Sequence, residues 1–264
     1  MVTCQRVMEI MECIAPKKLA EDWDNPGLLV GSPKDETERI LVCLDVREDT
    51  AERAAREGFG LIVAHHPVIF RGVRKLRTDL PDGRLLGSLL RSRIAVFAAH
   101  TNLDSVEGGV NDVLAEKVGI DMATLAPLDP SVLLGEGLGR IGRLAEPTDA
   151  DSFARRVRDA LGASHVRLVR GDGRKVKKVG LCSGSGAEFI ERAAFLGCDA
   201  FVTGDVRYHD AQRAAALGMH VVDAGHFATE QPVVPMLAAR LAEELAGEAE
   251  VVADDSARDF FETL

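Results

Sequence analysis

The feature that most constrains the fold of this sequence is a strand–helix–strand–helix–strand pattern that occurs twice. The first copy reads ERILVCLDV, EDTAERAAREG and FGLIVAHHP, and it continues through a second helical stretch to RIAVFAAHTNLD. The second copy reads KKVGLCSGSG, AEFIERAAFLG and CDAFVTGDV, and it continues to GMHVVDAGHFATE. Short apolar strands that alternate with helices predict a parallel sheet covered by helices.

Two copies of this pattern predict an α/β protein with two similar three-layer lobes, over residues 1–126 and residues 127–264. The alternative is a coincidental similarity of two βαβ units within one continuous sheet. Residues 125–147 are rich in Gly, Leu and Pro, and we expect them to connect the lobes. The last predicted helix, residues 235–246, ends the ordered pattern, with the option that it packs back on the first lobe.

Composition and charge indicate which partners and which cellular compartment to expect for this chain. The formal net charge is −10, and the densest basic runs lack interleaved aromatic residues, so we expect no nucleic-acid partner. No apolar run approaches the roughly 20 residues that span a bilayer, so we expect no membrane partner. The N-terminal stretch contains acidic residues and does not match a signal peptide. With five cysteines and no CxxC motif, the chain fits a reducing cytoplasm best.

Histidines and carboxylates follow several predicted strands, at the carboxyl ends where open parallel sheets bind their ligands. Two adjacent histidines and a proline end the run LIVAHHP, which is typical of a chain leaving a sheet. The candidates at these ends are His65, His66, His100, Asp104, His226 and Glu230.

Imidazole and carboxylate groups are the usual ligands of zinc, iron, manganese and cobalt. Three histidines and two carboxylates exceed a structural zinc site and suit a dinuclear centre with open positions. We expect Thr229 to cap a helix that has Glu230 in its first turn, which leaves His226 in the preceding loop. Taken singly, each of these residues has an ordinary explanation, as a loop histidine or as an acid near a helix N-terminus. Taken jointly, these residues favour a metal-binding site.

Four motifs in order, EDWDNPGLLVG, HHP, HTNLD and GHFATE, resemble the GTP cyclohydrolase 1 type 2 homologs, also called the Ngg-one-interacting-factor-three-like proteins. The resemblance extends from about residue 20 to residue 237 and implies a two-metal site between the lobes. It also implies a homohexamer, and the inserted domain of longer members has no room here. The implied ligands are His66 and Asp104 for one ion, His65 and His226 for the other, and Glu230 bridging both.

The resemblance implies a metal-dependent hydrolase that opens the ring of a purine nucleotide such as GTP, a small-molecule substrate. Two divalent ions (Zn, Fe, Mn or Co) would be its cofactors, with Glu230 and His100 as catalytic candidates. For His100, an ordinary strand-end histidine is an equal alternative. A non-catalytic protein that binds metal for regulation or delivery remains the alternative function. Fold and motif do not fix a substrate.

Three further segments have less specific interpretations. The GSG at residues 184–186 predicts a tight turn, with phosphate binding at a helix N-terminus as the alternative. The WDN at residues 23–25 is expected to structure the N-terminal turn. Arg207, Tyr208 and His209 are expected near the internal cavity that the metal sites face in the implied homohexamer, and they have no assigned roles. A flavin or NAD protein is disfavoured, because no G-x-G-x-x-G opens a helix.

Overall fold

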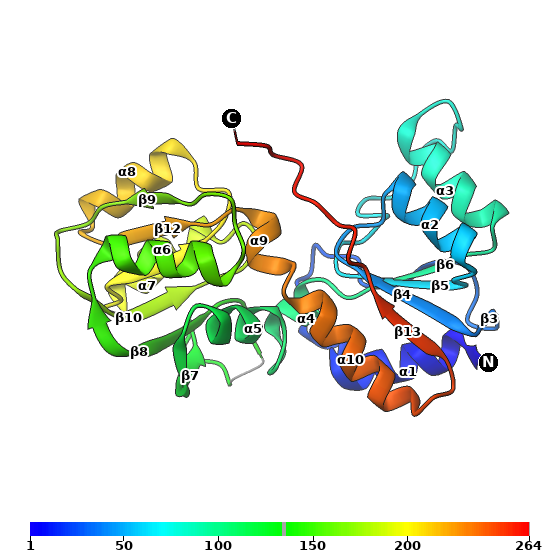
Figure 1. The fold of residues 1–264 in the computed structure, drawn as a ribbon, viewed down its shortest axis with the longest axis horizontal. Helices are drawn as coiled ribbons and strands as arrows, with labels where there is room; N and C mark the ends of the chain where they lie inside the picture. Colours follow the sequence, from blue (N-terminus) through cyan, green and yellow to red (C-terminus); the bar gives the residue numbers. More distant parts are fainter. Residues whose placement is uncertain (134–135, 264) are drawn as a thin grey trace. The chain divides into compact units, whose positions relative to one another are not determined.

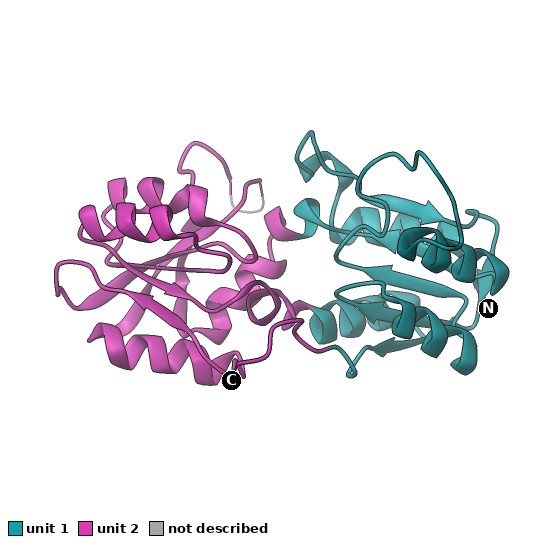
Figure 2. Ribbon diagram, turned by 90° about the horizontal axis from the view of Figure 1, so that it is seen from above, with its two compact units in different colours: residues 1–103, 234–257 teal, residues 104–233, 258–264 magenta. Residues whose placement is uncertain are grey.

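The computed structural model describes residues 1–133 and 136–263, and it divides into two compact units (Figures 1 and 2). Each unit has its own main sheet, with hydrophobic side chains packed against it. Unit 1 comprises residues 1–103 and 234–257, and unit 2 comprises the described residues of 104–233 together with 258–263.

The α/β class predicted from the two copies is confirmed. Each copy forms a sheet of its own, so the interpretation as one continuous sheet is wrong. The division differs from the one expected at residues 126 and 127. Residues 125–147 do not connect the units, because they belong to two antiparallel strands of unit 2 and the loop between them. Residues 134 and 135 of that segment lie outside the described residues.

The sheet of unit 1 has the strand order β13-β4-β5-β6-β2. Strands β13, β4, β5 and β6 are parallel, and β2 runs antiparallel to β6 at one edge. A separate ladder joins β1 to β3. The strands are β1 Val2–Thr3, β2 Gly27–Val30, β3 Glu36–Thr37, β4 Arg39–Cys43, β5 Leu61–Ala64, β6 Ala95–Ala98 and β13 Glu250–Ala253.

Helices cover both faces of this sheet, α2 and α3 on one face and α1 and α10 on the other (Figure 1). Helix α2 carries Glu48 and Asp49 in its first turn, which complements the helix dipole, and ends at Gly58 in the left-handed conformation. Alternate strand residues such as Leu41 and Ile62 pack with α2 and α3. The helices are α1 Cys4–Ile14, η1 Lys17–Leu19, α2 Glu48–Glu57, α3 Pro81–Arg91 and α10 Val233–Leu245.

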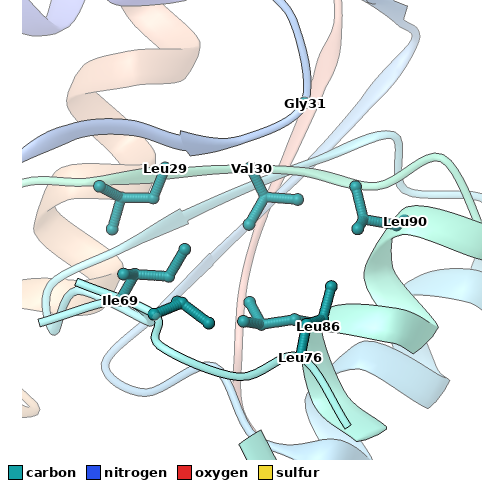
Figure 3. A pocket seen from close by; sticks show the side chains of 8 residues that line it. Leu29, Val30, Gly31, Ile69, Leu76, Leu86 and Leu90 are labelled. Atoms are coloured by element: carbon teal, nitrogen blue, oxygen red, sulfur yellow. The ribbon is translucent and has the colours of Figure 1, made fainter. Parts of the chain in front are cut away.

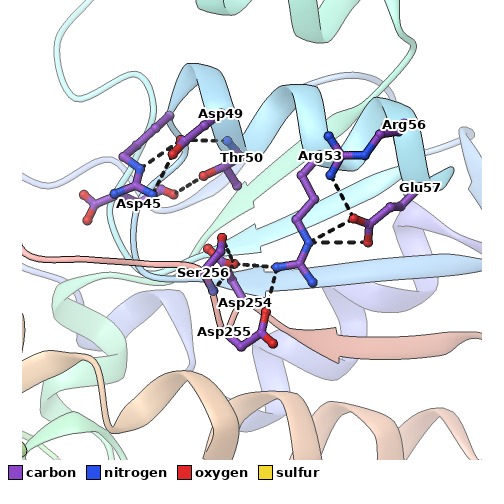
Figure 4. A network of polar contacts seen from close by, with 10 residues as sticks. Asp45, Asp49, Thr50, Arg53, Arg56, Glu57, Asp254, Asp255 and Ser256 are labelled. Carbon is purple, nitrogen blue, oxygen red and sulfur yellow. Dashed lines mark hydrogen bonds and ion pairs between the residues drawn. The ribbon is translucent and has the colours of Figure 1, made fainter.

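Strand β13 was not predicted, and it corrects the expectation that order ends with the last helix. It pairs in parallel with β4, with Val251 opposite Ile40. The residues after it are held by polar contacts with α2 (Figure 4). Arg53 donates to Asp254 Oδ1 at 2.7 Å and to Asp255 Oδ1 at 3.0 Å. The pairing therefore makes the C-terminal strand an edge of the unit 1 sheet.

The sheet of unit 2 has the order β7-β8-β10-β11-β12-β9. Its centre, β10, β11 and β12, is parallel and contains the second copy of the repeated pattern. The flanking strands β7, β8 and β9 run antiparallel to their neighbours. The strands are β7 Ile120–Pro127, β8 Arg140–Thr148, β9 Arg167–Val169, β10 Val176–Leu181, β11 Ala200–Thr203 and β12 His220–Asp223.

Unit 2 has a separate core on each face of its sheet. Val202 and Val222 pack with α5 and α6, whereas their strand neighbours Phe201 and Val221 pack with α7 and α8. This alternation confirms three layers in unit 2. The helices are α5 Val110–Lys117, α6 Ala150–Ala160, η2 Ala187–Phe189, α7 Ile190–Phe195, α8 Tyr208–Ala216 and α9 His226–Glu230.

Helix α4, Thr101–Ser105, contains the first of the points at which the chain passes from one unit to the other. Across residues 1–133 and 136–263, no helix is both long enough and apolar enough to cross a membrane.

Candidate metal-binding site

Three histidines form a cluster at one end of the unit 1 sheet. His65 and His66 follow β5, and His100 follows β6. These strands are parallel neighbours, with Ala64 opposite Ala98, so their carboxyl ends lie at the same edge. The ring centroids lie 4.9 Å (His65–His66), 5.3 Å (His65–His100) and 5.6 Å (His66–His100) apart. One ligand atom from each histidine lies within 4.8 Å of the others, so the group can hold a metal ion.

Two rings of this cluster are oriented by oxygen acceptors. His65 is buried, and its Nδ1 lies 2.9 Å from the backbone oxygen of Ala99. Nδ1 of His66 lies 2.8 Å from Asp45 Oδ1. Because both partners are acceptors, Nδ1 is the donor, and the lone pair of the neutral ring is on Nε2. Metal-binding histidines are held in this way by carbonyl and carboxylate oxygens.

Asp24 holds the third ring. Its Oδ1 lies 2.8 Å from His100 Nδ1, and its Oδ2 accepts from the backbone N–H and the hydroxyl of Thr101 at 3.0 and 2.5 Å. Burial opposes ionisation of Asp24, but the hydrogen bonds from His100 and Thr101 outweigh it and hold the pKa of this carboxyl well below its usual range. The side chain of Asp24 is therefore a buried anion that positions His100. From the sequence, Asp24 was expected only to structure the N-terminal turn.

In unit 2, His226 begins helix α9 and Glu230 ends it. They are an i, i+4 pair, with His226 Nε2 3.1 Å from Glu230 Oε2. The expectation that His226 lies in a loop before the helix is wrong, because Gly225, at φ +85°, starts the helix directly before it. Thr229 is not a cap. Its hydroxyl donates back to the turn at Gly225 and His226, and it accepts from the N–H of Gly184 at 2.9 Å.

Asp205 orients the ring of His226 as Asp45 orients that of His66. Its Oδ2 lies 2.8 Å from His226 Nδ1. Asp205 follows β11 in the left-handed region, at φ +55°, a conformation that Asp tolerates better than most residues. With Nδ1 as the donor, the lone pair of Nε2 faces the Glu230 carboxylate. A proton or a metal ion between these two atoms would make that contact favourable.

Glycines leave the space that Glu230 and His226 occupy. A Cβ on Gly184 would lie 2.2 Å from Glu230 Oε1, and one on Gly204 would lie 2.6 Å from the backbone nitrogen of His226. The GSG segment is thus a tight turn that fits against the carboxylate. The helices after it, η2 and α7, are too short to support the alternative of a phosphate site.

Asp104 is buried in unit 2, at the end of α4. Its Oδ1 accepts from the hydroxyl of Ser183 at 3.3 Å. Asn111 links the same two residues, since it donates to the backbone oxygen of Asp104 and accepts from the N–H of Ser183. These contacts fix the carboxylate beside the end of β10. Its place in unit 2, one residue after the unit boundary, was not expected from the sequence.

The remaining candidates take ordinary positions. Arg207 precedes α8, which begins at Tyr208, and His209 lies 3.4 Å from Gln212 on the same exposed helix surface. A cavity of about 250 Å³ in unit 1 is lined by apolar side chains and one glycine, so it is not a metal site (Figure 3). Its lining residues are Leu29, Val30, Gly31, Ile69, Val73, Leu76, Leu86 and Leu90.

Fold and side-chain chemistry together define a class: α/β proteins whose strand ends present oriented histidines and buried carboxylates suited to transition-metal ions. Within that class, the chain belongs to the Duf34/NIF3 (NGG1p interacting factor 3) family, whose model matches residues 2–259. The resemblance drawn from the four motifs is confirmed.

Curated relatives match over most of their length. A GTP cyclohydrolase 1 type 2 homolog of Clostridium perfringens is 34% identical over 259 residues, which cover 98% of each chain. A homolog of the same name from Streptomyces coelicolor is 34% identical, covering 90% of this chain and 85% of the relative. Among solved structures, a Bacillus cereus protein related to NIF3 gives a TM-score of 0.91 at 25% identity, covering 100% of this chain and 99% of the other. Reduced HcgD from Methanocaldococcus jannaschii gives 0.81 at 28% identity, covering 96% and 98%.

Proposed function

We propose that this chain binds two divalent transition-metal ions and uses them to hydrolyse a purine nucleotide such as GTP. One observation carries the proposal. In His65, His66 and His226, Nδ1 faces a carbonyl or carboxylate oxygen of the same unit at 2.8–2.9 Å. This arrangement presents Nε2 as the ligand atom and is the usual support of metal-binding histidines.

The proposed ligands are the five residues expected from the sequence. His66 and Asp104 would hold one ion, His65 and His226 would hold the other, and Glu230 would serve both. Mixed imidazole and carboxylate donors fit zinc, iron, manganese or cobalt. When bound, two such ions would make water a strong nucleophile at neutral pH and stabilise negative charge on the reacting oxygens.

The chain's own residues supply the remaining chemistry. Glu230 is a carboxylate with only 4% of its surface exposed, so it can accept a proton without competition from bulk water. His100, anchored by Asp24 through Nδ1, can transfer a proton through Nε2. The printed names of the relatives support a nucleotide substrate only by analogy, since each is called a homolog.

Elemental analysis of the purified protein tests the metal part of the proposal. We expect about two transition-metal ions per chain, and a loss of at least one ion in His66→Ala and in Glu230→Gln. His209→Ala is the matched control, because His209 lies on the exposed surface of α8. Equal metal content in all four proteins, or none in the wild type after reconstitution, would contradict the proposal.

Incubation of the metal-loaded protein with GTP, followed by chromatography of the products, tests the reaction. Opening of the purine ring that is lost in Glu230→Gln would support a hydrolase. Two bound ions without turnover would instead favour the non-catalytic alternative, a protein for metal regulation or delivery. Light scattering of the same samples tests the homohexamer, which stays a prediction from the resemblance.

A further inference from the structure

Two aromatic side chains of unit 1 are exposed next to each other. Trp23 is 58% exposed and Phe70 is 43% exposed, and their ring centroids lie 5.9 Å apart. Aromatic residues are scarce in this chain, at 5%, and Trp23 is its single tryptophan. Each ring keeps about half of its surface in water, and two such rings side by side form an exposed aromatic surface of the kind that binds ligands.

The pair lies at the rim of the histidine cluster. The ring of His100 is 6.2 Å from that of Trp23 and 6.2 Å from that of Phe70, with both contacts edge-on. His100 in turn is the neighbour of His65 and His66. The planes of the Trp23 and Phe70 rings are tilted by 58° to each other, so a planar group stacked on one ring would contact the other at an angle. Such a group would lie beside the candidate ligands of unit 1.

Hydrogen bonds fix the positions of these two aromatic residues relative to each other. Asn25, two residues after Trp23, donates from its side chain to the backbone oxygen of Ile69 at 2.6 Å. Ile69 directly precedes Phe70, so this bond fastens one aromatic loop to the other. Asp24 anchors the first loop through Thr101 and His100. The aromatic pair is thus held in place before any ligand arrives, which lowers the entropic cost of binding.

The loop after Phe70 adds positive charge. It reads RGVRKLR and places Arg71, Arg74 and Lys75 on an exposed segment of a chain whose net charge is −10, whereas Arg77 is paired with Asp79. Guanidinium and ammonium groups bind phosphate oxygens. An aromatic ring followed closely in the chain by basic side chains combines the two features that recognise a planar ring carrying an anionic group.

We propose that Trp23 forms a stacking platform for the planar ring of an anionic small molecule, with the tilted ring of Phe70 as its side wall and the basic side chains of residues 71–75 binding the phosphate. This inference rests on the proposed function and names the positioning residues and chemical class of its substrate. Two rings offer a few hundred Å² of surface, well below the roughly 800 Å² per partner of a stable protein interface. The platform therefore fits a small ligand better than a protein.

The single tryptophan makes the test direct, since all tryptophan emission comes from Trp23. Zinc-loaded and metal-free proteins are titrated with GTP, guanosine and inorganic triphosphate; zinc is suitable because it has no redox chemistry. We expect GTP and guanosine to quench the emission, triphosphate to leave it unchanged, and GTP to bind more tightly than guanosine. A base stacked on an aromatic ring commonly gains about 10-fold in affinity from it.

Equilibrium dialysis then compares variants. Trp23→Leu should weaken GTP binding about 10-fold and keep its zinc content, whereas Phe195→Leu, which alters an 82% exposed aromatic on α7, should change neither. Unaltered GTP binding in Trp23→Leu, no quenching by either purine, loss of zinc in this variant, or a change in its oligomer size would each overturn the platform. Failure of the proposed function would look different. In that case the wild type would bind no metal, but GTP and guanosine would still quench the emission of Trp23.

Discussion

The substitution Gly184→Ala tests how the tight turn after β10 supports Glu230. Gly184 has φ +59°, and an added Cβ would lie 2.2 Å from Glu230 Oε1, against an ordinary contact of at least 3.4 Å. The carboxylate would have to move by about 1.2 Å, the difference between these distances. Because Glu230 is buried, that movement strains its surroundings, and we expect it to cost about 1–3 kcal/mol.

The left-handed backbone adds a second cost, which a matched control can separate. Gly162 lies in the same unit at φ +62° and has no atom within 4 Å of its added Cβ. Gly162→Ala should therefore lower the free energy of unfolding only by the cost of the left-handed backbone, about 1–2 kcal/mol. Gly184→Ala should lower the free energy of unfolding by about 2–5 kcal/mol, because the backbone cost and the displacement of the carboxylate add. The difference between the two variants isolates the displacement of the carboxylate.

Urea unfolding of the metal-free variants measures this difference, since bound metal would add its own stabilisation. Chelator competition then measures metal binding, where we expect Gly184→Ala to lose at least about 10-fold in affinity, the scale found for disturbed ligand shells. Gly162→Ala should bind metal like the wild type. Equal unfolding free energies for the two variants, together with equal metal affinity, would refute the reasoning.

Three further predictions concern other parts of the chain. Asp45→Asn should weaken metal binding about 10–100-fold in chelator competition, because it removes the carboxylate that orients His66. Arg140→Met should lower the free energy of unfolding in urea by about 3–5 kcal/mol, because it leaves Asp112 buried without its 2.6 Å partner. Iodoacetamide at pH 8 should modify only Cys13 in the native protein. Burial raises the pKa of the other four thiols, to about 11 for Cys4 and about 12 for Cys198 and well above the usual value for Cys43 and Cys182.

Each of these has a control within the same chain. Asp49→Asn removes a carboxylate that binds Arg47, and it should leave metal affinity unchanged. Arg213→Met breaks an exposed ion pair and should cost less than about 1 kcal/mol. In denaturant, all five thiols should react, since a raised pKa keeps a thiol protonated at pH 8 only while it is buried. Labelling of a second thiol in the native protein would contradict the burial argument. The predictions for Asp45→Asn and Arg140→Met would be contradicted if each variant behaved like its control.

The central strands could be predicted because each is an apolar run bounded by turn residues. The edge strands could not. Glu250–Ala253 is short and follows the acidic end of a helix, and only its pairing with β4 makes it a strand. Strands β7 and β8 flank a glycine-rich loop and expose much of their length, so their composition suggested a connection between lobes. Tertiary pairing decided the structure of these segments.

The candidate ligands could be predicted from residue type and from their places at strand ends. Their supporting carboxylates were missed, because only the fold brings them near the histidines. Asp24 is separated from His100 by 76 residues, and Asp45 and Asp205 are each separated from their histidines by 21 residues. A carboxylate at such a distance has no local pattern that marks it as a partner.

One signal for two of these carboxylates was nevertheless present in the sequence. Residues 45–66 read DVREDTAERAAREGFGLIVAHH, and residues 205–226 read DVRYHDAQRAAALGMHVVDAGH. The two segments align without a gap, and they begin at the supporting aspartates and end at His66 and His226. The repeat therefore matches β4–α2–β5 with β11–α8–β12, one strand later in unit 2 than the pairing of ERILVCLDV with KKVGLCSGSG, which sets β4 against β10.

The structure gives this alignment a physical meaning. In both segments, an aspartate that follows one parallel strand orients a histidine that follows the neighbouring strand, at the same distance of 2.8 Å. In both, an arginine precedes the intervening helix, and a glycine with φ of +70° to +75° returns the chain to the sheet. The two segments share the carboxylate–histidine pair, which is the part that a metal site would require, whereas the residues on their helix surfaces differ. Asp205→Asn should accordingly weaken metal binding as much as Asp45→Asn, and an effect confined to one of them would separate the two halves of the proposed centre.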